Sequence, residues 1–169
     1  DRHVRALTKS LPQDLLPSEI DVVPGAVWID EADYSAFAKH LAGDDWKLIS
    51  WAEAKIAREP MTGTWSVQTN GPIGTAASSQ WGTNRKNAYD ILEAALNQKD
   101  PDVYDSGVDG PVFNPLETAN ARLKLEDIKS EFTRWLWSDD DRARRLARRY
   151  NDQYNCWVTR QYDGSRLRL

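Results

Sequence analysis

Residues 114–137 have the sequence NPLETANARLKLEDIKSEFTRWLW, and this stretch decides the fold of the C-terminal half. Pro115 after Asn114 is typical of a helix start, because the fixed φ of proline suits the first turn. The apolar residues that follow step by four, three, four and three positions, which places them on one helix face. They are Ala121, Leu125, Ile128, Phe132 and Trp135. We therefore expect a long helix from about residue 115.

A second C-terminal helix is expected after the polar string Ser138-Asp139-Asp140-Asp141, which restarts the helical pattern through about Tyr154. Its expected buried stripe consists of Leu146, Ala147, Tyr150 and Tyr154.

Two shorter helices are expected on the N-terminal side. One runs from Glu31 to Ala42, with Asp30 as N-cap and Gly43 after its end. The other runs from about residue 84 to residue 97. The apolar positions expected to face the core are Tyr34, Phe37, Ala38 and Leu41 in the first helix, and Tyr89, Leu92 and Leu96 in the second.

Residues 46–79 have the pattern of strands, with 46–49 and the alternating run 63–68 as the clearest candidates. The loop 98–114 contains short extended pieces at 103–104 and 112–113. We therefore expect an α+β fold, with a small, mainly antiparallel sheet with helices and a long helical C-terminal half.

One domain over residues 1–169 is expected from the chain length. It divides into an irregular arm at 1–27 with one helical turn at 13–16, a mixed α+β part at 28–114, and a helical, arginine-rich part at 115–169. The chain begins abruptly with Asp1-Arg2-His3, which favours a fragment of a larger protein.

Composition limits the classes of function. No apolar run approaches the roughly 18 residues that a membrane-spanning helix needs. His3 and His40 are isolated, and the single cysteine, Cys156, is expected to be a buried thiol, so we expect no metal site and no cofactor. Eight tryptophans predict a tryptophan-rich core or groove.

The string Asp30-Glu31-Ala32-Asp33 has the letters of the magnesium-binding box of helicases. That box acts together with a phosphate loop of the pattern G-x-x-x-x-G-K-[ST], which this sequence lacks. Capping and the helix dipole explain the four residues as a helix start. Asn114-Pro115-Leu116 similarly has only part of a methyltransferase loop motif, so we expect no catalytic site in this chain.

Arginines near the C-terminus are the main candidates for a binding site. Residues 1–133 carry a net charge of −8, whereas residues 134–169 carry nine arginines against five aspartates. Arginine matches phosphate oxygens, so the predicted nucleic-acid contacts are Arg142, Arg145, Arg149, Arg160, Arg166 and Arg168. The alternative is a solvated face, paired with Asp139–Asp141 and with other acids of the chain.

A smaller candidate lies at residues 79–86, read as a strand-to-helix junction. Trp81, Arg85 and Lys86 would surround a helix N-terminus there, which favours an anion, so these three residues are further predicted nucleic-acid contacts. The alternative is a capped helix with a buried tryptophan.

Several segments together resemble one family. They include Gly25–Ile29 with Tyr34 and Phe37, Trp81–Arg85 leading to Leu96-Asn97, Asn114 with Glu117-Thr118, Ala121 and Lys124, Phe132 with Trp135, Tyr150-Asn151 with Tyr154-Asn155, and Tyr162–Ser165. Their order resembles the stretch between the methylase and helicase parts of large phage and plasmid proteins. These combine an N6-adenine DNA methylase region with a Swi/Snf-type helicase, and some resemble anti-restriction proteins.

The resemblance implies DNA as the substrate of the parent protein and a bacterial or phage cytoplasmic setting. It transfers no catalytic residue. We therefore expect a non-catalytic, DNA-associated accessory domain whose partners are DNA and the neighbouring helicase and methylase-like domains. The alternative is a structural inter-domain or protein-interaction module that does not bind nucleic acid.

Overall fold

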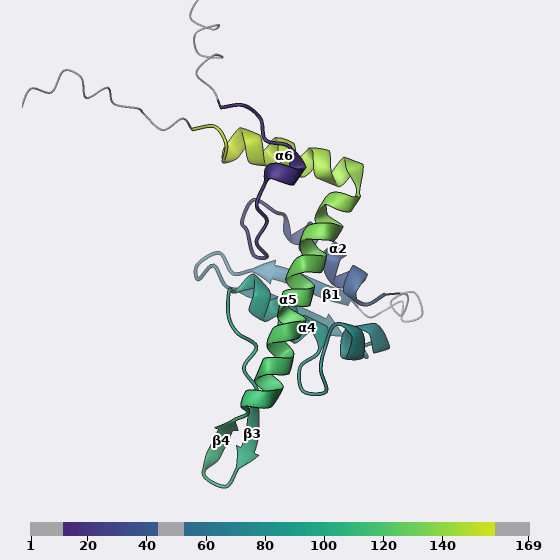
Figure 1. Ribbon diagram of the computed structural model, residues 1–169, viewed down its shortest axis with the longest axis vertical. Helices are drawn as coiled ribbons and strands as arrows, with labels where there is room; N and C mark the ends of the chain where they lie inside the picture. Colours follow the sequence, from purple (N-terminus) through teal and green to yellow (C-terminus); the bar gives the residue numbers. More distant parts are fainter. Residues whose placement is uncertain (1–11, 44–52, 158–169) are drawn as a thin grey trace, which may run out of the picture. The chain divides into compact units, whose positions relative to one another are not determined.

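The computed structural model describes residues 12–43 and 53–157 of the chain (Figure 1). Helices and two small antiparallel sheets alternate along it, which confirms the expected α+β class. In chain order the elements are η1 (Pro17–Glu19), α2 (Glu31–Leu41), β1 (Glu53–Arg58), β2 (Trp65–Asn70), the π-helix η2 (Ala76–Gln80), α4 (Ala88–Leu96), β3 (Tyr104–Gly107), β4 (Gly110–Phe113), α5 (Pro115–Ser138) and α6 (Asp140–Gln153).

Contacts group the chain into two compact units. Of the described residues, the larger unit contains 22–43 and 53–139, and the smaller one joins residues 12–21 to residues 140–157. That the chain forms one domain stays a prediction.

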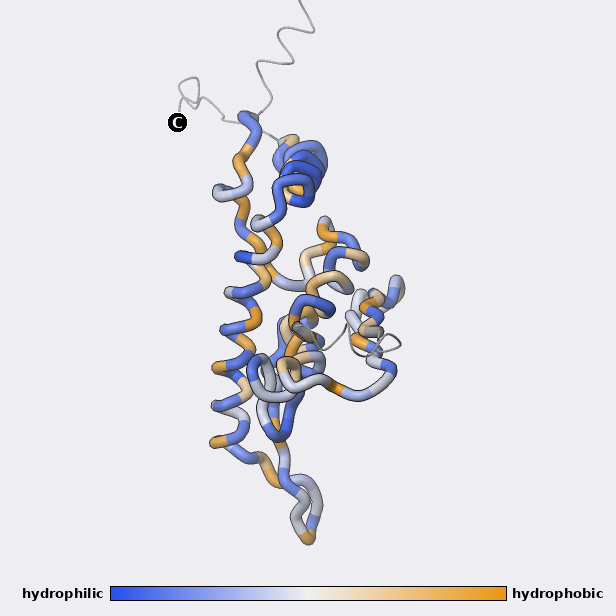
Figure 2. The backbone as a smooth tube through the Cα atoms, turned by 90° about the vertical axis from the view of Figure 1, so that its right-hand side faces the viewer, coloured by the Kyte–Doolittle hydropathy of each residue, from blue (hydrophilic) through white to orange (hydrophobic). Residues whose placement is uncertain are grey.

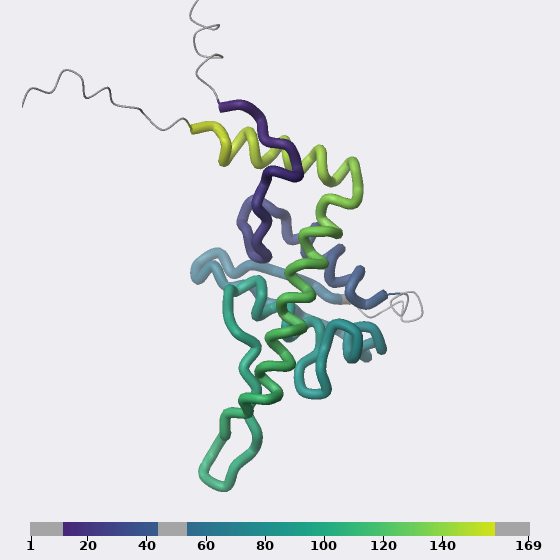
Figure 3. The backbone as a smooth tube through the Cα atoms, in the orientation of Figure 1, coloured from purple at the N-terminus to yellow at the C-terminus, as the bar shows by residue number. Residues whose placement is uncertain are grey.

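Helix α5 lies against the rest of the larger unit along much of its length (Figures 1 and 3). Strands β1 and β2 form an antiparallel pair in which Ile56 lies opposite Val67. Helix α2 contacts β1, and α4 contacts both β2 and α5. These helices and strands enclose one core. The predicted apolar face of α5 contributes Leu125, Ile128 and Phe132 to it.

Aromatic rings fill the centre of this core. Phe132 is fully buried, with its ring centroid 5.4 Å from that of Tyr34 and 4.9 Å from that of Phe37. Tyr34 also meets Trp65 edge to face at 4.9 Å. The Tyr34 hydroxyl donates to the carbonyl oxygen of Ala26 at 3.0 Å, and burial raises the pKa of that hydroxyl. The tryptophan-rich core expected from composition is therefore partly confirmed, with Tyr and Phe at its centre.

The loop before α2 passes close to the end of α4, which requires a glycine. Gly25 has φ +87°, and a Cβ atom at this position would lie 2.0 Å from the carbonyl oxygen of Leu96. The Gly25 carbonyl also accepts a hydrogen bond from the indole nitrogen of Trp65 at 3.3 Å. A side chain at residue 25 would therefore separate the loop from α4.

Helix α2 begins where capping predicts. Asp30 is its N-cap, and the Asp30 carbonyl accepts from the backbone N–H groups of Asp33 and Tyr34. Gly43 follows the helix with φ +64°. The predicted helix start at residues 30–33 is confirmed, although the Asp30 side chain makes no hydrogen bond to the first turn.

Helix α4 begins four residues later than predicted. The Thr83 hydroxyl accepts from the backbone N–H groups of Arg85 and Lys86, and the Lys86 carbonyl accepts from Thr83 N at 2.7 Å. This local turn replaces helical hydrogen bonds. Asn87 then caps the helix by accepting from Tyr89 N and Asp90 N.

Strands depart from the prediction at two places. Residues 65–70 form β2, close to the predicted 63–68, whereas the predicted strand at 46–49 lies outside the described residues. Residues 76–80 form a π-helix rather than extended chain, so the strand prediction before the turn at 81–87 is wrong.

The extended pieces predicted at 103–104 and 112–113 correspond to the strands 104–107 and 110–113 of a β-hairpin that leads into α5. Tyr104 lies opposite Phe113, and Gly107 opposite Gly110. Asn114 caps α5 by accepting from Glu117 N at 3.0 Å, as the Asn-Pro pattern predicts.

In the smaller unit, α6 begins after residue 139 as predicted, but its buried stripe is rotated. The buried residues are Ala143, Leu146, Ala147 and Asn151. Tyr150 is half-buried and Tyr154 is exposed, so the expected stripe is wrong at both tyrosines. The N-terminal helical turn is also displaced, from the predicted 13–16 to 17–19, where Pro17 occupies the first position.

Candidate functional site

Helix α6 carries the central part of the predicted arginine cluster. Arg145 is exposed, and Arg142 and Arg149 are half-buried, all within one continuous helix. Their i, i+3 and i+7 spacing therefore places them on one face. Arg160, Arg166 and Arg168 lie outside the described residues.

Two further arginines of α6 make ion pairs at the surface. Arg144 pairs with Asp141, one turn earlier. Arg148 pairs with Asp152 at 2.7 Å and with Asp14 at 3.5 Å. Pairs between such exposed side chains contribute little free energy, typically about 0–1 kcal/mol. The predicted pairing with the Asp139–Asp141 string is thus seen for Arg144.

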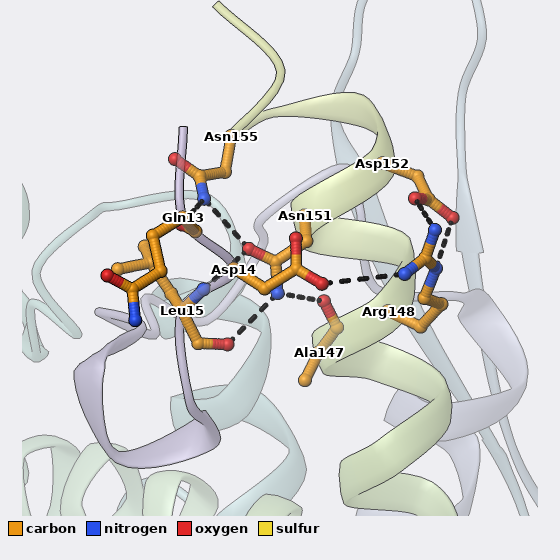
Figure 4. Close-up of polar contacts among 8 residues, drawn as sticks. All are labelled: Gln13, Asp14, Leu15, Ala147, Arg148, Asn151, Asp152 and Asn155. Atoms are coloured by element: carbon orange, nitrogen blue, oxygen red, sulfur yellow. Dashed lines mark hydrogen bonds and ion pairs between the residues drawn. The ribbon is translucent and has the colours of Figure 1, made fainter. Parts of the chain in front are cut away.

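An N-terminal segment, residues 12–19, packs beside α6, and Figure 4 shows the contacts that its residues 13–15 make with the helix. Asn151 accepts from the backbone N–H of Leu15 at 2.8 Å and donates to the Leu15 carbonyl at 2.9 Å. Asn155, one turn later, donates to the Gln13 carbonyl at 2.8 Å. These two asparagines hold the main chain of the segment, and the Asp14–Arg148 pair adds a side-chain contact.

Trp81 lies in a pocket of the larger unit, which we call the Trp81 pocket. Its volume is about 590 Å³. The end of α2 contributes Lys39 and His40, and α5 contributes Glu131 and Arg134. The Lys124 ammonium donates to the Gln80 carbonyl at 2.7 Å, which ties the turn before Trp81 to α5.

A buried carboxylate organises one wall of this pocket. Glu131 is only 7% exposed; its Oε1 lies 2.7 Å from His40 Nε2, and its Oε2 accepts from Arg134. A buried carboxylate is costly unless it is paired, so these contacts hold all three side chains in place. The arrangement leaves an oriented imidazole and a guanidinium beside the indole.

The other two residues predicted with Trp81 have different surroundings. Arg85 donates to Asp105 at 2.7 Å and to the Tyr104 carbonyl at 2.9 Å, so it connects the loop before α4 to the hairpin. Hydrogen bonds from Arg85 and Asn114 lower the pKa of Asp105. Lys86 is half-buried at the same turn. Their contact with nucleic acid stays a prediction.

The β3–β4 hairpin exposes apolar side chains. Val108 at its turn is fully exposed, and Tyr104, Val112 and Phe113 are about half exposed or more. In Figure 2 the tip of this hairpin is orange, the colour of hydrophobic residues. Residues 100–117 contain five acidic residues and no basic one.

The single cysteine departs from the prediction. Cys156 is exposed, so the expected buried thiol is wrong. Within residues 12–43 and 53–157, no three or more His, Cys, Asp or Glu side chains group together in a way that suits a metal ion.

The same part of the chain contains no helix with the length and apolarity required to cross a membrane.

Sequence patterns missed the cations of the Trp81 pocket. The sequence predicts Trp81 as a contact residue but places Arg85 and Lys86 beside it. The structure instead brings Lys39 and Arg134 to the pocket from two distant helices. The spacing of residues within one segment cannot predict a pocket that is built from several helices. The one sequence signal was Glu131, a charged residue on the apolar side of α5.

Comparison with known proteins gives one match. No curated protein and no solved structure matches this chain. A family model described as a domain of unknown function, DUF8437, matches residues 23–156, from the loop before α2 to the end of the described α6 region. Because the match covers most of the sequence, the chain belongs to the DUF8437 family.

Proposed function

We propose that this chain is a non-catalytic, DNA-associated accessory domain of a larger protein, and that α6 contacts the phosphates. The observation that carries the proposal is a helix with five arginines between residues 142 and 149. Arginine at exposed or half-exposed helical positions suits phosphate oxygens, and phosphate contacts position a protein on DNA without reading sequence.

The ion pairs of α6 are compatible with this role. Arg144 is 76% exposed and Arg148 is 68% exposed, each beside a comparably exposed or half-exposed aspartate. Because such pairs contribute little free energy, a phosphate can replace the aspartate at small cost. Trp157, which is 84% exposed just after α6, offers a ring on which a base can stack.

The resemblance to methylase–helicase proteins supports the proposed setting. In that setting the domain works between a methylase-like and a helicase part in a bacterial or phage cytoplasm, and it keeps the duplex or a displaced strand near the motor.

Fluorescence anisotropy with a labelled duplex and a labelled single strand tests the proposal. We expect binding that weakens steeply with salt, since each phosphate contact on duplex DNA contributes about 0.9 to the salt slope. The double variant Arg145→Ala with Arg149→Ala should lower that slope by about two. The matched control, Lys55→Ala with Lys99→Ala, removes two exposed charges from the larger unit and should change little. No binding at low salt refutes the proposal.

A second candidate is the protein-interaction module, which the β3–β4 hairpin favours. A two-stranded hairpin is marginally stable alone, and this one exposes aromatic and aliphatic side chains among acidic residues. It would dock on a basic, apolar surface of a neighbouring domain. Val112→Lys should then weaken association with the flanking domains of the parent, measured by chemical-shift perturbation, while DNA binding stays unchanged.

A further inference from the structure

The Trp81 pocket combines an aromatic ring with a surplus of positive charge. Trp81 is half-buried, so its indole is anchored while part of it stays accessible. Lys39 and Arg134 are positive, and Glu131 is the one acid among the described residues that line the pocket. The lining therefore favours a ligand with a negative group even when His40 is neutral.

Glu131 does not compete strongly with such a ligand. Both of its oxygens are engaged, one by His40 at 2.7 Å and the other by Arg134. The Arg134 guanidinium uses one nitrogen in that contact and remains 76% exposed. A guanidinium has five N–H donors, so Arg134 still has donors for an anion.

The size and chemistry of the pocket define the ligand class. Its volume of about 590 Å³ lies within the usual range for small-molecule sites. A nucleobase stacks on an indole with little dependence on its identity, and arginine and lysine suit a phosphate. We propose that the Trp81 pocket binds one nucleotide unit, with the base on Trp81 and the phosphate at Lys39 and Arg134.

This inference goes beyond the proposed function of α6 and does not depend on it. The pocket lies in the larger unit, whereas α6 belongs to the smaller one. An unstacked nucleotide of a single strand and a free nucleotide share the chemistry that the pocket recognises. Free deoxyadenosine monophosphate is therefore a sufficient probe.

The test is an NMR titration of the 169-residue chain, followed through the backbone N–H signals of Gly43 and Gln80, which line the pocket and are present in every variant. We expect saturable binding of deoxyadenosine monophosphate, and weaker binding of deoxyadenosine and of inorganic phosphate, because each supplies half of the contacts. Trp81→Leu should weaken binding roughly 5- to 150-fold, the range for loss of one stacked base. Lys39→Ala should weaken it by up to roughly fivefold, as for an exposed ion pair.

Matched controls separate the pocket from general effects. Trp157→Leu removes an exposed tryptophan of the other unit, and Lys55→Ala an exposed lysine; neither should change nucleotide binding. If inorganic phosphate binds as tightly as the nucleotide, the base does not contact Trp81. If millimolar nucleotide changes no chemical shift, the pocket does not bind nucleotides. If Trp81→Leu misfolds, Lys39→Ala and the comparison of nucleotide with nucleoside still decide the question.

The two proposals can be refuted independently of each other. Arg145→Ala with Arg149→Ala should abolish most DNA affinity but leave nucleotide binding unchanged. Intact nucleotide binding without any DNA binding refutes the role of α6 alone, and DNA binding without nucleotide binding refutes the pocket alone.

Discussion

Asn151→Ala should release the N-terminal segment from α6. The Asn151 side chain makes two hydrogen bonds to the main chain of Leu15, at 2.8 and 2.9 Å. A neutral hydrogen bond contributes about 1 kcal/mol net, so docking of the segment should weaken by about 2 kcal/mol. That free energy corresponds to a roughly 30-fold larger undocked population.

Hydrogen–deuterium exchange measures this change. The suitable reporter is the backbone N–H of Glu19, which donates to the Leu16 carbonyl at 2.9 Å and does not itself contact Asn151. Its exchange should accelerate roughly 30-fold in Asn151→Ala. Asn155→Ala, which removes one bond to the segment, should accelerate it about fivefold.

Arg144→Ala serves as the control, because Arg144 pairs with Asp141 on α6 and not with the segment. If Asn151→Ala left exchange at Glu19 unchanged while circular dichroism showed an intact α6, the asparagine contacts would not hold the segment, and the reasoning would be refuted.

Four further predictions concern the larger unit. Phe132→Ala should lower the free energy of unfolding in urea by about 3–5 kcal/mol, because it empties a fully buried position; a loss below about 1 kcal/mol would contradict the packing. Asn87→Ala should cost about 1 kcal/mol in thermal unfolding by removing the α4 cap, and an unchanged melting temperature would argue against that cap. The pKa of Tyr34 is raised in the folded state, so its contribution to stability is present below pH 10 and decreases as pH rises above it; Tyr34→Phe should flatten this alkaline slope in chemical denaturation. The pKa of Asp105 is lowered, so its contact with Arg85 should persist above the ordinary aspartate pKa and weaken as pH falls through the folded value; a carboxyl NMR titration that gave an ordinary midpoint would contradict this.

Local chemistry predicted the helices best. Asn114 caps α5 and Asp30 occupies the N-cap position of α2, and both positions can be recognised from the adjacent sequence alone. The start of α4 was missed for a local reason too, since the Thr83 hydroxyl forms a turn that competes with the helix.

Tertiary contacts account for the remaining differences. Asn151 is buried in place of the tyrosines because it binds the main chain of Leu15, 136 residues away in sequence. The candidate site could likewise be predicted only in part, because it also depends on contacts between residues distant in sequence. Trp81 and the arginines of α6 could be selected from the sequence as candidate contact residues. Lys39 and Arg134 could not be assigned to Trp81, because α2 and α5 meet only in the folded chain.

The asparagine contacts on α6 also bear on how fragments of this family are designed. The family match begins at residue 23 and ends at residue 156, so it includes α6 but omits residues 12–19. A fragment cut at those limits keeps Asn151 and Leu146 while removing the segment whose main chain Asn151 binds. Fragments for expression should therefore start at or before residue 12, so that the recombinant protein keeps the segment that contacts this helix.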